Sequence, residues 1–171
     1  PGNDFAIVKK AAYKFKDFME NEMNMSVFLM TTGSKGLHIV SPLKAREDFD
    51  TVRTFARNIS AYLAIKYPDD YTVEIRKDKR KGRLFLDYLR NAYAQTGVAP
   101  YSLRAIPGAP VATPISWTDL KKKGFNSQSY NINNIFKRLS GLSEDPWDGF
   151  SGKAKSISKA VKRLDKILES R

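Results

Sequence analysis

The chain of 171 residues contains no cysteine, and this absence excludes several kinds of chemistry. It can form no disulfide framework, no zinc site built on thiolates and no cysteine nucleophile, a composition compatible with a reducing compartment. No run of about 18 apolar residues is present, so we expect no membrane-spanning segment. The N-terminal sequence does not resemble a signal peptide, because charged residues interrupt its apolar positions.

Acidic residues are scarce relative to basic ones. Thirty Lys and Arg face 18 Asp and Glu, giving a formal charge of +12 and a sequence pI near 9.8. This balance favours a polyanion partner, and a soluble protein that is merely basic is the alternative. With 42% apolar residues and no internal repeat, residues 1–171 are expected to form a single domain.

Helical and extended patterns alternate along the sequence. Apolar spacing, with Asp4 as the first cap, predicts helices at residues 5–24, 47–67, 116–123, 131–139 and 157–168. Short apolar runs predict extended segments at residues 26–32, 37–42, 83–88 and 99–105, with a proline- and glycine-rich loop at 106–115. Residues 151–171 are expected to carry a basic amphipathic terminal helix. The order predicts an α/β or α+β domain.

The segment "TTGSKGLHIVSP", residues 31–42, has features of an anion-binding turn. Gly33 and Gly36 allow a sharp turn and a close backbone approach, while Lys35 and free N–H groups attract anions. It is not a Walker A loop, because Lys35 precedes the second glycine and the sequence enters a strand. Thr32 and His38 flank the turn, so a hydroxyl and an imidazole could converge on one phosphate. A half-buried histidine on an apolar strand is the alternative.

A second group of candidates surrounds the predicted strand at 83–88. Asp87 follows apolar residues, where a carboxylate is costly unless a cation pairs with it. That cation could be a neighbouring arginine or a divalent ion such as Mg²⁺ or Mn²⁺. Arg80, Arg90 and Arg104 flank this strand and the next, and alternate strands of one sheet would aim them at one pocket. For most of residues 76–83, a solvated basic loop is the simpler interpretation.

Four stretches occur in an order that resembles a known family. They read "TTGSKGLHIVSPL", "RKGRLFLDYLRN", "GVAPYSLRA" and "PVATPISWTDL". They are similar to the polymerase domain of bacterial ligase D, a branch of the archaeo-eukaryotic primase superfamily that acts in non-homologous end joining. Its motifs read approximately T-S-G-G-K-G-x-H, h-D-W-x-Q-N and A-P-Y-S-x-R. The resemblance extends from Pro1 to about Leu139, with Ser34 in place of a glycine and "DYLRN" in place of "DWSQN".

The resemblance implies a fold, an activity and roles for particular residues. The fold is a primase-polymerase core with a mixed, largely antiparallel sheet flanked by helices, and the activity extends DNA ends or fills gaps, often with ribonucleotides. It uses two ions of Mn²⁺ or Mg²⁺. Thr32 and His38 match the groups that bind the incoming triphosphate, with Lys35 in the same turn. Asp87 matches the third metal carboxylate, the catalytic position. The basic residues around the nucleotide and the metal are matched by Arg80, Arg90 and Arg104.

One departure concerns the first motif of the family, a D-h-D pair before Pro-Gly. The chain begins "PGND", and Asp4 suits a helix cap better than a metal site. Two-metal phosphoryl transfer needs those carboxylates, so we expect the chain to be the C-terminal part of a longer domain and inactive alone.

The implied partners are DNA with a 3′ end and a 5′-phosphate, nucleoside triphosphates, and the ligase domain and Ku, in the cytoplasm at the nucleoid. Three alternatives stay open. A replicative primase small subunit commonly carries a zinc-binding cysteine cluster, which this chain lacks. A non-catalytic nucleic-acid-binding module explains the charge but not Asp87 among arginines. An RNA-recognition domain needs exposed aromatic residues on its sheet, and no stretch shows that motif clearly.

Overall fold

The computed structural model describes residues 5–170, so the predicted capping by Asp4 lies outside the described residues. The chain divides into two compact units. The first, here called the hairpin unit, comprises the chain up to Lys16 together with Ser26–Pro42 and Val98–Ala154. The second, the helical unit, comprises Asp17–Met25, Leu43–Gly97 and the segment from Lys155.

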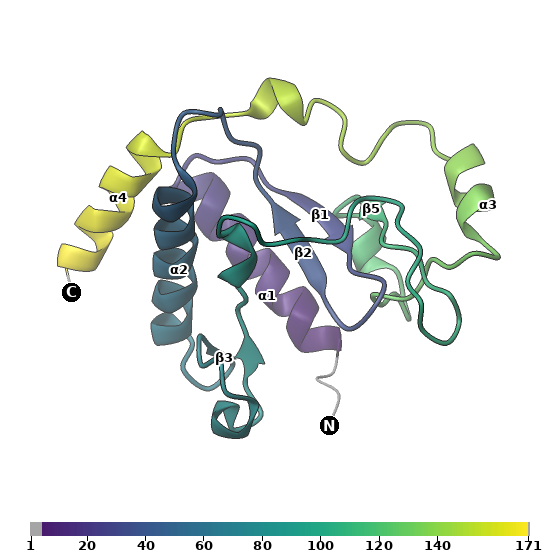
Figure 1. Ribbon diagram of the computed structural model, residues 1–171, viewed down its shortest axis with the longest axis horizontal. Coiled ribbons are helices and arrows are strands. Elements are labelled where there is room, and N and C mark those ends of the chain that lie inside the picture. Colours follow the sequence, from purple (N-terminus) through teal and green to yellow (C-terminus); the bar gives the residue numbers. More distant parts are fainter. Residues whose placement is uncertain (1–4, 171) are drawn as a thin grey trace. The chain divides into compact units, whose positions relative to one another are not determined.

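The hairpin unit is built on a three-stranded antiparallel sheet in the order β2-β1-β5 (Figure 1). Strand β1, Phe28–Thr31, pairs with β2, Leu37–Val40, and with β5, Pro114–Ile115. The strands predicted at 26–32 and 37–42 are thus confirmed. The loop expected at 106–115 is wrong at its end, because β5 supplies the second partner of β1. Pro114 is tolerated since β5 is an edge strand.

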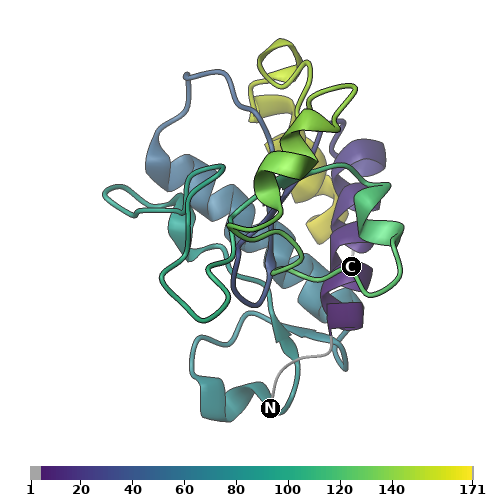
Figure 2. The same cartoon turned by 90° about the vertical axis from the view of Figure 1, so that its right-hand side faces the viewer.

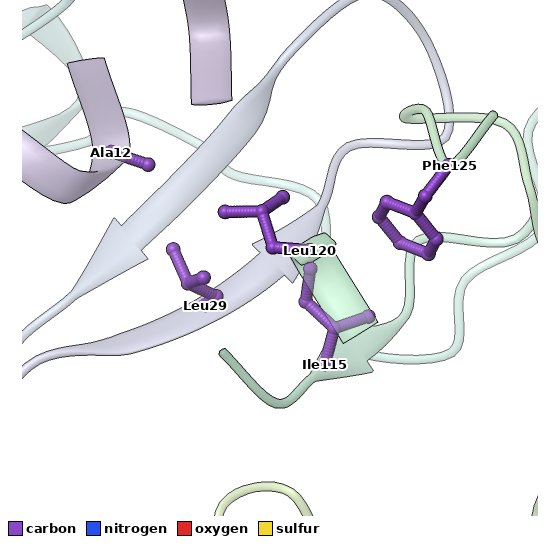
Figure 3. Close-up of a cluster of buried hydrophobic side chains, with 5 residues drawn as sticks. All are labelled: Ala12, Leu29, Ile115, Leu120 and Phe125. Atoms are coloured by element: carbon purple, nitrogen blue, oxygen red, sulfur yellow. The ribbon is translucent and has the colours of Figure 1, made fainter. Parts of the chain in front are cut away.

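Helix α1, Phe5–Asp17, packs on one face of this sheet. The five buried side chains in Figure 3 make the contact, and they come from α1, two strands and the segment after them: Ala12, Leu29, Ile115, Leu120 and Phe125. Leu37 and Ile39 of β2 pack against the same cluster. A π-helical stretch, Phe18–Glu22, follows α1.

An aromatic group covers the other face of the sheet. The ring of Phe28 lies edge-on to Trp147 and Phe150, with centroid distances of 6.2 and 5.0 Å. Trp147 Nε1–H also donates to the carbonyl oxygen of Leu29 at 2.7 Å. Residues more than a hundred positions apart therefore meet at the Phe28 end of this face.

Asp119 links the two short helices that follow β5. Helix η4 spans Asp119–Lys121, and α3 spans Ile135–Ser140. The Asp119 carboxylate is only 4% exposed and bonds to Lys122 Nζ at 2.5 Å and Arg138 Nη2 at 2.7 Å. Burial alone would raise the pKa of Asp119, but hydrogen bonds from Lys122 and the Ser116 N–H, with the Arg138 charge, lower it.

The helical unit centres on α2, Phe49–Lys66, which Asp48 caps by accepting a hydrogen bond from Thr51 N at 2.7 Å. Helix α2 contacts α4, Ser158–Glu169, and a two-stranded parallel sheet formed by β3, Tyr71–Thr72, and β4, Leu84–Phe85. Three 3-10 turns complete the chain: η2, Lys77–Arg80; η3, Leu89–Asn91; and η5, Ser151–Lys153. The fold is mixed α and β with a small antiparallel sheet, as predicted. None of its described helices combines the length and apolarity needed to cross a membrane.

Candidate functional site

The turn between β1 and β2 is organised by the side chain of Thr32. Its Oγ1 donates to the Gly36 carbonyl at 3.0 Å and accepts the N–H groups of Ser34 and Gly36, each at 3.2 Å. A backbone bond from Thr32 N to Gly36 O, at 3.1 Å, closes the same turn. The expectation of free N–H groups is therefore wrong for Ser34 and Gly36, because the threonine hydroxyl occupies both.

Gly33 brings the turn into contact with the segment that carries Arg104. Its φ of +66° is in the left-handed region, and a Cβ built there would lie 2.7 Å from Arg104 Cγ and 3.2 Å from Ala112 N. Arg104 Nη1 donates to the Thr32 carbonyl at 3.0 Å. Two stretches of the sequence that resemble family motifs, "TTGSKG" and "APYSLR", thus meet at one point in the hairpin unit.

The segment carrying Arg104 is itself a small hairpin. Arg104 N donates to Pro110 O at 2.8 Å, and Ala112 N donates to Ser102 O at 2.9 Å. Ser127 Oγ, on a following loop, donates to the Ser34 carbonyl. The sequence analysis missed Ser127, and no local pattern marks it, because its partner lies 93 residues away.

Thr32 and His38 share one face of the β1–β2 hairpin. His38 pairs with Met30 in the antiparallel register, and side chains alternate along strands, so Met30, Thr32 and His38 lie on one face. Leu37 and Ile39 point the other way, into the core cluster. His38 is half-buried and Lys35, at the tip of the turn, is exposed. The imidazole, the ammonium and the Arg104 guanidinium all belong to the hairpin unit.

Asp87 lies in the helical unit, and the structure corrects its predicted surroundings. Strand β4 ends at Phe85, because β3 offers only two residues for pairing. Leu86 is buried, but Asp87 is exposed and accepts the Leu89 N–H at 2.9 Å. The carboxylate is therefore not a buried group in an apolar strand, and solvation removes the need for a neutralising partner.

Arg80 and Arg90 also belong to the helical unit. Arg80 ends η2, donates to the carbonyls of Glu74 and Ile75 at 2.9 and 2.8 Å, and stacks 4.1 Å from the Phe85 ring centroid. Arg90 is exposed in η3 and bonds to Gln95 Oε1 at 3.3 Å. The expectation that these arginines and Arg104 project from alternate strands of one sheet is wrong, because none of the three lies on such a strand.

The described residues do not by themselves fit a two-metal centre. Among residues 5–170, no cluster of three or more His, Asp or Glu side chains could hold a metal ion. Asp87 supplies one carboxylate, and one of its oxygens already accepts the Leu89 N–H. Two hard cations require more oxygen ligands than this.

Comparisons with known proteins agree on one family. The family described as LigD, primase-polymerase domain, matches residues 1–147. The multifunctional non-homologous end joining protein LigD of Pseudomonas aeruginosa is 37% identical over 145 residues, which cover 84% of this chain. The bifunctional LigD of Bacillus subtilis is 25% identical over 138 residues, or 80% of this chain. Among solved structures, the polymerase domain of Mycobacterium tuberculosis ligase D in complex with DNA matches 90% of the chain, with a TM-score of 0.80 and 25% identity.

These relatives are longer than the matched region. The chain covers 17% of the Pseudomonas protein, 22% of the Bacillus protein and 52% of the Mycobacterium polymerase-domain chain. The match nevertheless includes most of this sequence and all four of its motif stretches. The chain belongs to the LigD primase-polymerase domain family.

Proposed function

We propose that this chain is part of a primase-type DNA repair polymerase. Such a nucleotidyltransferase extends DNA ends or fills gaps with nucleotides or ribonucleotides during non-homologous end joining. The observation that carries the proposal is the meeting of the Gly33 turn with Arg104, which brings two motif stretches together beside the exposed Lys35. Family membership and the formal charge of +12 support the same conclusion.

The hairpin unit binds the triphosphate in this proposal. Arg104 uses one N–H to hold the Thr32 carbonyl, and a guanidinium has five N–H groups, so others remain to bind phosphate oxygens. Lys35 adds positive charge at the exposed tip of the turn. His38 donates to the phosphates from the face that it shares with Thr32. Thr32 has two tasks: its hydroxyl orders the turn and lies next to the bound anion.

The helical unit contributes the other matched residues. Asp87 is the carboxylate that faces a divalent ion, and its exposure leaves an oxygen accessible. Arg90 is exposed and binds a nucleotide phosphate. The hydrogen bonds and ring stacking of Arg80 hold its guanidinium in place beside the basic segment.

Nucleotide addition requires carboxylates beyond these residues, and strand β2 offers a place for them. β2 is an edge strand of the described sheet, with its sequence "LHIV" unprotected by proline, lysine or a bulge. The bond from Thr32 N to Gly36 O fixes the alternation of hydrogen bonds along β1 and β2. By that alternation the backbone N–H and C=O groups of His38 and Val40 bond to β1. The backbone N–H and C=O groups of Leu37 and Ile39 point away from β1, toward the open edge of the sheet.

We infer that a further strand of the domain, outside these 171 residues, pairs with the open edge of β2. Two carboxylates spaced two residues apart on such a strand share one face of the sheet. Placed on the face of His38, they would flank the bound triphosphate. The chain alone is therefore expected to bind nucleotide and DNA without extending a primer.

The remaining partners follow from the proposed role. They are DNA with a 3′ end and a 5′-phosphate, nucleoside triphosphates, and the ligase domain and Ku of an end-joining system, at the bacterial nucleoid. Family membership and the formal charge of +12 support these partners.

The experiment that tests the proposal is a calorimetric titration of ATP onto the chain and onto His38→Ala. A lost hydrogen bond to a charged group costs about 1.5–3 kcal/mol, so we expect affinity to fall by about tenfold to 150-fold. Gln128→Ala, an exposed position in the same unit, is the matched control and should bind as the unaltered chain does. Equal affinity of His38→Ala and the control would contradict the assignment. Binding of DNA without ATP would favour the non-catalytic nucleic-acid-binding alternative.

A further inference from the structure

A group of lysines lies along one side of the hairpin unit. Its members are on α1 and around η4, and we call them the α1–η4 lysine face: Lys9, Lys16, Lys121, Lys122 and Lys123. Figure 2 shows η4 alongside α1, and Lys9 Nζ donates to the Lys122 carbonyl at 3.5 Å. The two segments are therefore in contact, and both carry lysines.

Helix geometry and aromatic contacts order the α1 members of this face. Lys9, Tyr13 and Lys16 are spaced four and three residues apart, so they form one stripe. Tyr13 and Lys16 both contact Trp117, with a ring centroid distance of 5.6 Å and an ammonium-to-centroid distance of 5.4 Å. Lys9 Nζ lies 5.8 Å from the Phe125 ring centroid. These contacts hold the two ammonium groups over rings and limit the side-chain entropy lost on binding.

Lysines outnumber acidic residues on the two segments that form this face. Helix α1 and residues 116–125 together hold seven lysines and two acidic residues, Asp17 and Asp119. The Asp119 carboxylate is buried and bonds to Lys122 and Arg138. Lys121 and Lys123 are exposed on either side of Lys122, so the face keeps a net positive charge.

The lysine face and His38 lie on opposite sides of the sheet. Helix α1 packs on the face of Leu29, Leu37 and Ile39. By strand alternation His38 points away from that face. A ligand on the lysines therefore cannot be the nucleotide proposed to bind at the turn.

We propose that the α1–η4 lysine face binds the phosphate backbone of duplex DNA, independently of sequence. The proposal rests on the proposed function, which makes DNA the available polyanion. Lys9 and Lys16 are about 10 Å apart along the helix, at 1.5 Å per residue, a length comparable to about three base steps of 3.4 Å. Lysine ammonium groups act as point charges that suit a uniform row of phosphates. In this proposal the α1–η4 lysine face binds duplex DNA away from the 3′ end that is extended.

The test compares two triple variants with the same change in charge. Lys9, Lys121 and Lys123 are replaced by glutamine in one, and Lys159, Lys162 and Lys166 of α4 in the control. Binding to a blunt 20-base-pair duplex is measured across a series of salt concentrations. Each phosphate contact contributes about 0.9 to the slope of log K against log salt, so the first variant should lose about 2–3 in slope and the control much less.

Several results would overturn the proposal. Equal losses in the two variants would mean that only net charge matters, and no loss in either would place the DNA elsewhere. A first variant that loses binding to poly-glutamate but not to the duplex would indicate an acidic protein partner. Lys121→Glu/Lys123→Glu, at two exposed positions, repeats the test with α1 unaltered. ATP affinity, measured on the same samples, judges the nucleotide site separately and should stay unchanged.

Discussion

Replacing Gly33 with alanine should destabilise the hairpin unit and displace Arg104. The new Cβ would lie 2.7 Å from Arg104 Cγ and 3.2 Å from Ala112 N, at a φ of +66°. A left-handed conformation costs a residue with a side chain about 1–2 kcal/mol. The arginine can rotate away, but the backbone at Ala112 must shift, and such overpacking costs about 1–3 kcal/mol. We therefore expect a loss of about 2–5 kcal/mol in the free energy of unfolding.

The control is the same substitution three residues along the turn. A Cβ at Gly36 meets no atom within 4 Å, and its φ is outside the left-handed region. Gly36→Ala should therefore change stability by less than about 1 kcal/mol, in either direction.

Urea denaturation followed by tryptophan fluorescence measures both variants. The two tryptophans of the chain, Trp117 and Trp147, lie in the hairpin unit and report on it selectively. A difference of 2 kcal/mol corresponds to about a 30-fold change in the unfolding equilibrium constant. If Gly33→Ala and Gly36→Ala unfold at the same urea concentration, the close approach of Arg104 to the turn is not a constraint on the fold.

Three further predictions address other contacts. Trp147→Phe should lower the free energy of unfolding by about 0.5–1.5 kcal/mol in urea, because the buried Leu29 carbonyl, which also pairs with Ile115 of β5, loses the indole N–H as a second donor; no loss would contradict that bond. The pKa of Asp119 is lowered in the fold, so its ionised carboxylate stabilises the folded state above about pH 4, and this stabilisation is lost as pH falls through the folded pKa. The difference in melting temperature between the unaltered chain and Asp119→Asn should therefore shrink on acidification, and a difference that does not change with pH would contradict this. Asp87→Asn keeps an acceptor for Leu89 N–H, so it should unfold normally yet bind Mn²⁺ more weakly in a manganese titration, and unchanged Mn²⁺ affinity would reject the metal-facing role.

Local patterns predicted the elements that depend on local interactions. The β1–β2 hairpin follows from two apolar runs separated by a glycine-containing turn, and α2 follows from helical spacing that ends before Pro68. The motif stretches also predicted the family correctly. These features lie within short segments, where spacing alone carries the signal.

Features set by distant pairing could not be predicted. The prolines of residues 106–115 predict a loop, but Met30 and Leu29 of β1 pair with Pro114 and Ile115, which lie 84 and 86 positions away. Asp87 was expected in an apolar strand, yet β3 pairs with only two residues of β4 and leaves the carboxylate exposed. Arg80 and Arg90 belong to a different unit from Arg104, and membership of a unit depends on contacts between residues distant in the sequence.

Amide NMR spectra recorded during an ATP titration would show directly whether the turn and Arg104 form a triphosphate site. We expect saturable shifts at Gly33, Lys35, His38 and Arg104, with the amides of α4 unchanged. Such a pattern would place the phosphates at the meeting point of the two motif stretches. Shifts confined to other residues, or none at millimolar ATP, would contradict it.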